Sequence, residues 1–165
     1  MSAQNELPMI VTGSLFGAKI VTVGDTHACA VRSNGDLWCW GTGGLVGDGT
    51  ATSHPSPVPV GELGGVVAIG AGEAHTCAVQ TTGDVFCWGV GTQGQTTERY
   101  GLQWVSPIQV YGLPHPAVGI AAHEGNHSCA LLNDGTAWCW GANDTGQLGD
   151  GTITARFLPT PMKMN

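Results

Sequence analysis

Short apolar runs separated by turn residues recur along the whole chain, and none of them has a helical period. The same hydrophobic pattern appears three times, as HACAV, HTCAV and HSCAL at positions 27–31, 75–79 and 127–131. A second apolar run follows each of these, containing WCWG, FCWG and WCWG at 38–41, 86–89 and 138–141. Turn dipeptides stand between the two runs: Asn34-Gly35, Thr82-Gly83 and Asp134-Gly135. Apolar runs joined by such dipeptides predict β-hairpins.

The spacing of the copies predicts the architecture. The period is 48 residues and then 52. The first and third hairpins are followed by a Pro-containing run, at 53–60 and 153–162, which fits an edge strand because proline is tolerated there. About four short strands per unit, a Trp-Gly signature and no helical period are typical of β-propeller blades. We therefore expect one all-β domain over 1–165, with three four-stranded blades at roughly 12–60, 61–111 and 112–163. Residues 1–11 are expected to form an outer strand that closes a neighbouring blade.

The repeated motifs resemble the repeat of the regulator of chromosome condensation family, especially its bacterial, alpha-tubulin-suppressor-like members. Residues 121–152, AAHEGNHSCALLNDGTAWCWGANDTGQLGDGT, carry nearly the whole pattern. The first unit lacks the Asn and Gln that precede GDGT, and the second has GQTTERYG in place of the tail. The resemblance implies a propeller whose ring face binds protein partners, as in members that act on a small GTPase or attach to chromatin.

Three blades are fewer than the seven that the resemblance implies for a closed ring, so two blade faces with apolar side chains are left open. The simplest cover is a second copy of the chain. Two copies joined head to tail make a six-bladed ring, with the N-terminal strand of one chain completing the last blade of the other. Residues 7–9 and 159–162 fit this arrangement, because both look like the same outer strand. A larger ring and a piece of a longer propeller are the alternatives.

All six cysteines fall into pairs with the same spacing: Cys29 with Cys39, Cys77 with Cys87, and Cys129 with Cys139. A short hairpin loop puts the members of each pair opposite one another, within reach of a disulfide. Buried free thiols that fill a blade core are the alternative. Disulfides favour an oxidising compartment, extracellular or periplasmic, although no signal peptide is visible at the start MSAQNELPM. The spacing lacks the short CxxC knuckle of a structural zinc site.

A histidine opens each HxCA motif, and a carboxylate precedes each histidine. Imidazoles and carboxylates that converge near a propeller axis are the ligand set of Zn²⁺ or another divalent first-row metal. Such an ion would supply hydroxide for ester or phosphoester hydrolysis, with a carboxylate as base. The candidate metal ligands are His27, His75, His127 and His123, and the candidate catalytic carboxylates are Asp25, Glu73 and Glu124. The alternative is that each histidine is a hydrogen-bonding residue that fixes a tight strand connection.

Other functions have less support in the sequence. A serine triad is not expected, because no GxSxG elbow occurs and Ser128 points to the opposite side of its strand from His127. Only five residues are Lys or Arg and the net charge is −7, so a nucleic-acid surface lacks its electrostatic footprint. No run of 18 apolar residues suggests a membrane span. We expect a binding or scaffolding module first, with a metal-dependent hydrolase as the alternative, and the sequence leaves enzymatic activity open.

Overall fold

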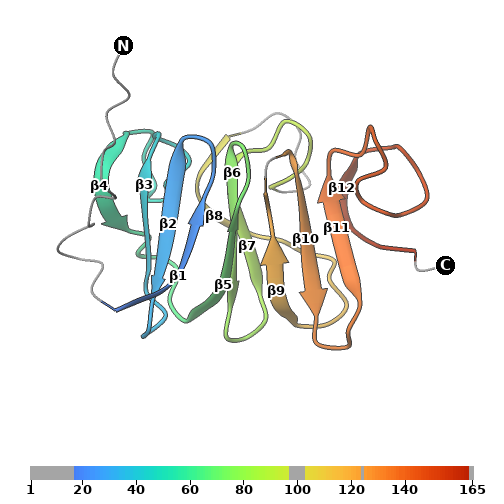
Figure 1. The fold of residues 1–165 in the computed structure, drawn as a ribbon, viewed down its shortest axis with the longest axis horizontal. Coiled ribbons are helices and arrows are strands. Elements are labelled where there is room, and N and C mark those ends of the chain that lie inside the picture. The colour runs from blue at the N-terminus through green and yellow to red at the C-terminus, as the bar shows by residue number, and fades with distance from the viewer. Residues whose placement is uncertain (1–16, 97–102, 124, 164–165) are drawn as a thin grey trace, which may run out of the picture.

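The computed structural model describes residues 17–96, 103–123 and 125–163. Within these ranges the chain forms only strands and turns, arranged in three four-stranded antiparallel sheets with consecutive strands adjacent (Figure 1). Blade 1 holds β1 (Ala18–Val23), β2 (His27–Arg32), β3 (Leu37–Gly41) and β4 (His54–Pro59). Blade 2 holds β5 (Val66–Ala71), β6 (His75–Gln80), β7 (Val85–Val90) and β8 (Gln103–Gln109). Blade 3 holds β9 (Ala117–Ala121), β10 (His127–Leu132), β11 (Ala137–Gly141) and β12 (Arg156–Pro161). The prediction of three four-stranded blades is confirmed.

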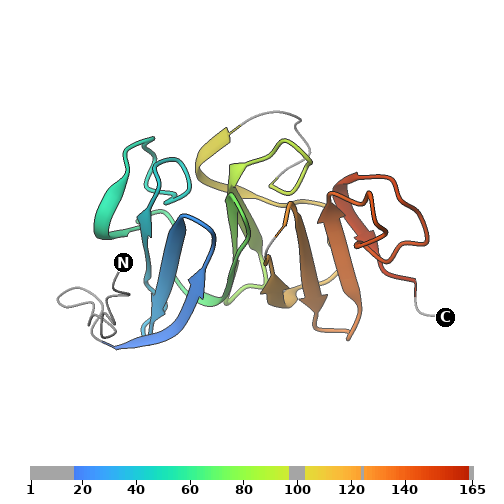
Figure 2. The same cartoon turned by 45° about the horizontal axis from the view of Figure 1, so that its top comes forward.

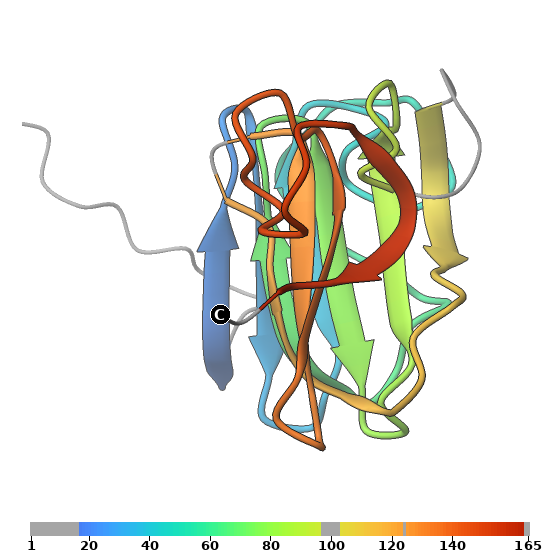
Figure 3. The same cartoon turned by 90° about the vertical axis from the view of Figure 1, so that its right-hand side faces the viewer.

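The blades stand side by side in chain order, as Figure 2 shows, and they overlie one another when the molecule is viewed along the row in Figure 3. The first strands of adjacent blades contact each other, β1 with β5 and β5 with β9. These three strands therefore form the inner side of the row, and β4, β8 and β12 form the outer side. The described part of the chain contains no helix long and apolar enough to cross a membrane.

The hairpin-turn glycines of blades 1 and 2 have two structural roles. Gly35 and Gly83 have φ angles of 86° and 85°, a left-handed conformation that side chains disfavour. Each glycine carbonyl also accepts a hydrogen bond from the first strand of the next blade, from Val66 N to Gly35 O at 3.0 Å and from Ala117 N to Gly83 O at 3.0 Å. A Cβ at Gly35 would lie 2.8 Å from Gly65 Cα, so the turn also permits close approach of the next blade.

The hydrophobic core lies between blades. In the first interface, Val31 and Leu37 of blade 1 pack with Ile69, Ala78 and Trp88 of blade 2. The second interface repeats this arrangement with Val79 and Val85 against Ala130, Ile120 and Trp140. Alternate residues of a strand point to opposite faces of its sheet. Blade 2 therefore packs one face on blade 1 and the other face on blade 3.

The six cysteines form three disulfides across the β2–β3, β6–β7 and β10–β11 hairpins, and none is free. The paired residues lie directly opposite in the strand register, with Cα atoms 4.1 Å apart in each pair. The predicted pairing is confirmed, while the oxidising compartment stays a prediction. The outer strand predicted for residues 1–11 and the carboxylate of Glu124 lie outside the described residues, and ring closure by a second copy is likewise untested.

Removing one disulfide gives a prediction for stability. In the double variant Cys77→Ala/Cys87→Ala, loss of the cross-link restores conformational freedom to the unfolded chain, and we expect the free energy of unfolding to fall by about 2 to 3 kcal/mol. Urea denaturation of the oxidised protein and the variant measures the difference. Equal midpoints and slopes for the two proteins would contradict a stabilising disulfide.

Candidate functional site

The three repeated histidines begin the second strand of each blade: His27 in β2, His75 in β6 and His127 in β10. A tight connection precedes the first two, closed by hydrogen bonds from Gly24 N to His27 O at 2.9 Å and from Gly72 N to His75 O at 2.8 Å. The imidazole rings lie against these glycines. A Cβ at Gly72 would stand 2.3 Å from His75 Cε1, so only glycine leaves room for the ring.

Two of the imidazoles reach a hydroxyl on the next blade. His27 Nε2 and Thr76 Oγ1 share a hydrogen bond of 2.7 Å, and His75 Nε2 and Ser128 Oγ share one of 2.9 Å. The Ser128 hydroxyl donates its hydrogen to the Gln95 carbonyl at 3.3 Å, so its oxygen accepts from the N–H at Nε2 of the neutral His75 ring. We call this pair of bonds the histidine–hydroxyl contacts. They join blade 1 to blade 2 and blade 2 to blade 3.

Burial keeps these histidines neutral. His75, Thr76 and Ser128 have no exposed surface, and His27 is 4 % exposed. Desolvation by burial, together with the positive charges that His27 and His127 would carry, lowers the pKa of His75 to about 3. Burial also lowers the pKa of His27, although Asp25 acts in the opposite direction. At neutral pH the contacts are therefore bonds between uncharged groups.

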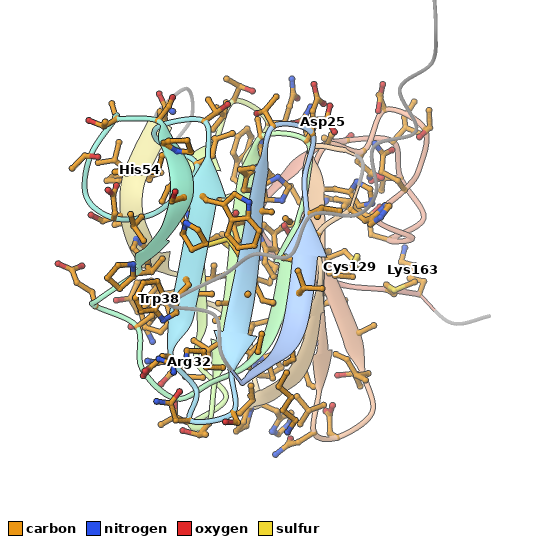
Figure 4. All side chains as sticks on the ribbon, turned by 60° about the vertical axis from the view of Figure 1, so that its left-hand side comes forward. Asp25, Arg32, Trp38, His54, Cys129 and Lys163 are labelled. Atoms are coloured by element: carbon orange, nitrogen blue, oxygen red, sulfur yellow. A yellow bond between two sulfur atoms is a disulfide. The ribbon has the colours of Figure 1, made fainter. Side chains whose placement is uncertain are left out.

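The carboxylates of Asp25 and Glu73 do not group with the buried imidazoles as metal ligands would. Asp25 and Glu73 are exposed, and Figure 4 places Asp25 and Arg32 at opposite ends of β2. Glu73 Oε2 accepts a hydrogen bond from Asn126 Nδ2 at 3.2 Å, and Asn126 Oδ1 accepts one from Gln95 Nε2 at 3.0 Å. Glu73 therefore takes part in a chain of amide contacts between blades 2 and 3.

The structure does not bring the predicted metal ligands together. Over residues 17–96, 103–123 and 125–163, no three His, Cys, Asp or Glu side chains are grouped as a metal site would require. The Nε2 atoms of His27 and His75 bond to hydroxyls, and His123 is an exposed residue near the start of the β9–β10 connection. Zinc binding by these histidines, and a catalytic role for Asp25, Glu73 or Glu124, stay predictions.

Within the described residues, no further blade covers either end of the blade row. Leu131 of β10 is 48 % exposed, whereas Val31 and Val79 at the same register position are 1 % and 0 % exposed. At the other end, Val21 and Val23 of β1 are 67 % and 64 % exposed. Their counterparts Ile69 and Ala71 in β5 are 9 % and 1 % exposed. We call the first surface the blade 3 face and the second the blade 1 face. Each exposes positions that blade stacking buries inside the chain.

A polar pocket of about 440 Å³ lies between the loops of blades 2 and 3. Its lining includes side-chain amides and one carboxylate: Gln93, Asn126, Asn143, Gln147 and Asp144. Asn143 is committed to the loop, since its Nδ2 donates to Asp150 and to the carbonyls of Thr152 and Thr154. Asp150 also pairs with Arg156 at 2.6 Å, and hydrogen bonds from Thr152 and Arg156 hold its pKa well below the usual range.

Sequence reasoning missed the hydroxyl partners. Ser128 lies on the opposite side of its strand from His127, as expected, but its role is to meet His75 of the preceding blade. The available signal was the residue after each histidine, which is Thr76 in the second copy and Ser128 in the third. In the first copy that residue is Ala28.

Loss of one hydroxyl tests the histidine–hydroxyl contacts. Thr76→Val keeps the shape of the side chain but leaves His27 Nε2 buried without a partner, so we expect a loss of about 1 to 3 kcal/mol in the free energy of unfolding. Thr154→Val, at an exposed loop position, is the matched control and should change stability by less than about 0.5 kcal/mol. Denaturant titration of both variants measures this. A Thr76→Val protein as stable as the control would refute the contact.

Acid should destabilise the protein through His75. The folded-state pKa is about 3 and the ordinary value is 6.5, so the unfolded chain binds the proton first as pH falls. Stability is fully present above pH 6.5 and is lost progressively toward pH 3. At about 1.4 kcal/mol per pKa unit, His75 alone accounts for about 2 to 3 kcal/mol between pH 6.5 and 4.5. Thermal unfolding as a function of pH measures this loss of stability. In the His75→Gln variant, stability should depend less on pH between 6.5 and 4.5. An unchanged profile in that variant would contradict the assignment.

Comparison with known proteins agrees with the blade geometry. Two profiles described as the regulator of chromosome condensation (RCC1) repeat match the chain, one at residues 18–45, 66–95 and 125–147 and the other at 34–79. Together they cover more than half of it.

Solved structures with the same fold span more than this chain does. Human WBSCR16 superposes with a TM-score of 0.78 at 23 % identity, over 93 % of this chain and 42 % of that one. Prp20p from Saccharomyces cerevisiae superposes with a TM-score of 0.76 at 21 % identity, over 90 % of this chain and 39 % of that one. The yeast RCC1 (Prp20) bound to Kap60 superposes with a TM-score of 0.72 at 22 % identity, over 90 % of this chain and 37 % of that one. The described chain thus spans about two fifths of the length of these structures. The repeat matches and the three blades together show that the chain belongs to the RCC1 repeat family.

Proposed function

We propose that this chain is a protein-binding scaffold module whose first partner is a second copy of itself. In this arrangement the blade 3 face of one copy packs on the blade 1 face of the other. Two copies make two such contacts, which we call seams, and together they close a ring of six blades. The observation that carries the proposal is the exposure of Leu131, Val21 and Val23 at positions that are buried wherever one blade follows another. Leaving such apolar surface in water is costly.

The polar groups at the two faces match as well. Inside the chain, a tryptophan of one blade donates to a loop carbonyl of the preceding blade, from Trp88 Nε1 to Leu45 O at 2.9 Å and from Trp140 Nε1 to Gln95 O at 3.0 Å. The blade 1 face carries Trp40 at the same position, and the blade 3 loop carries Gln147. In a head-to-tail pair, the Trp40 indole N–H of one copy is therefore the donor that fits the Gln147 carbonyl of the other.

The hairpin glycines support the same pairing. A Cβ built on Gly35 or Gly83 would strike the next blade, at 2.8 Å from Gly65 and 2.3 Å from Pro116. Gly135 of blade 3 has nothing within 4 Å, so its turn is open to an incoming strand. By the repeat, the backbone N–H of Ala18 in a second copy is the donor that fits the Gly135 carbonyl.

A completed ring is also the platform that we propose for external partners. Prp20p was characterised for binding to Gsp1p and histones, and yeast RCC1 (Prp20) was solved bound to Kap60. This chain has a net charge of −7 with five Lys or Arg residues, which favours a protein partner over nucleic acid. The polar pocket between the blade 2 and blade 3 loops offers amides that both donate and accept hydrogen bonds, as recognition of a peptide backbone requires.

Charge placed on the blade 3 face tests ring closure. Leu131→Glu puts a carboxylate where the second copy would bury it, so we expect dimers of the unmodified chain and monomers of the variant. Ile153→Glu is the matched control, since Ile153 is 73 % exposed and its counterpart in the first repeat, Ala51, stays exposed although blade 2 is present. Size-exclusion chromatography with light scattering gives the mass of each protein. A monomeric unmodified chain, or a Leu131→Glu variant that remains dimeric, would contradict the proposal.

A further inference from the structure

Both blade interfaces inside the chain contain a buried histidine–hydroxyl contact beside their apolar core. At each, the histidine that begins the second strand of one blade meets the hydroxyl residue directly after the equivalent histidine of the next blade, Thr76 or Ser128. Thr76 and Ser128 are fully buried. A buried imidazole without such a partner carries the full penalty of an unsatisfied polar group. The residue after the histidine therefore decides how well a blade can follow another.

The third histidine has no partner blade within the described chain. His127 is half-buried at the blade 3 face, in contrast to His27 and His75. In the proposed ring, the residue that meets it is the one after His27 of the second copy, which is Ala28. Alanine has no side-chain donor or acceptor, so His127 Nε2 would lose the contact that its two counterparts make.

The neighbours of Ala28 strengthen this contrast. In the strand register Ala28 pairs with Val23 on one side and Trp40 on the other. Thr76 pairs with Ala71 and Trp88 in the same way. Where blade 2 has Ala71 and Thr76, blade 1 has Val23 and Ala28. The blade 1 face is therefore more apolar at the point that His127 would meet.

We propose that the residue after the strand-initial histidine determines which blades can join, and that Ala28 makes the seam between copies weaker than the joints within each chain. This inference rests on the proposed ring. The blade 3 face fits best a blade with Ser or Thr at this position, and the ring of two copies opens at its two seams. The other seam contacts, Trp40 with the Gln147 carbonyl and Ala18 with the Gly135 carbonyl, follow the pattern of the internal joints and give the seam its specificity.

Installing the hydroxyl tests the inference directly. Ala28→Thr provides His127 of the second copy with a partner, and Ala28→Val adds a side chain of the same shape without the hydroxyl. Because one such bond stabilises a buried contact by about a factor of ten and a two-copy ring has two seams, we expect Ala28→Thr to lower the dimer dissociation constant by about 10- to 100-fold relative to Ala28→Val. Sedimentation velocity over a range of concentrations, on the full chain, measures it.

A second substitution identifies the partner of the new hydroxyl. In the double variant Ala28→Thr/His127→Leu the imidazole is absent, so the hydroxyl should give no advantage over Ala28→Val/His127→Leu. Circular dichroism of each variant confirms that the blades are folded. The double comparison isolates the coupling between positions 28 and 127 from changes in packing.

The outcomes separate the two proposals. If Ala28→Thr and Ala28→Val dimerise equally, or if the gain persists without His127, the inference is overturned and the ring stands. If the unmodified chain and Ala28→Thr are both monomers at every concentration, both the ring and the inference are overturned. If the unmodified chain is a weak dimer and Ala28→Thr associates more tightly than Ala28→Val only while His127 is present, the ring and the inference both hold.

Discussion

A single four-stranded sheet of this kind cannot bury either of its apolar faces by itself, and that constraint governs the whole molecule. Val31 and Leu37 point from one face of blade 1 and are covered by Ile69 and Trp88 of blade 2. The same positions recur in each blade, so stacking buries apolar surface only where a neighbour exists. Folding of this chain is therefore the stacking of its blades, and we propose that a second copy covers the two ends of the row.

Polar contacts give this stack its order. Apolar surfaces pack without much directional preference, whereas a buried imidazole needs one hydroxyl at one place. The contacts of His27 with Thr76 and of His75 with Ser128 fix each blade against the next at the end where β2 and β6 begin. Because burial keeps His75 neutral, the contact holds at neutral pH without a counter-ion, and no exposed carboxylate is required to balance it.

The repeat made most of the fold predictable from sequence. Asn34-Gly35 and its two counterparts predicted the hairpins, and hairpin register alone placed Cys29 opposite Cys39. The site was less predictable, because His27 and Thr76 are 49 positions apart and meet only after two blades stack. Proximity in sequence suggested that Asp25 and Glu73 belong with the histidines. In the folded chain the carboxylates face solvent while the imidazoles turn into the blade interface. Burial thus separates residues that the sequence places side by side.

Small-angle X-ray scattering from the full chain, collected as it elutes from a size-exclusion column, is the sharpest test of ring closure, because it gives mass and shape together. We expect twice the 16.9 kDa chain mass and the compact scattering profile of a closed ring. The mass of a single chain with the profile of an open row of blades, unchanged up to high concentration, would contradict it.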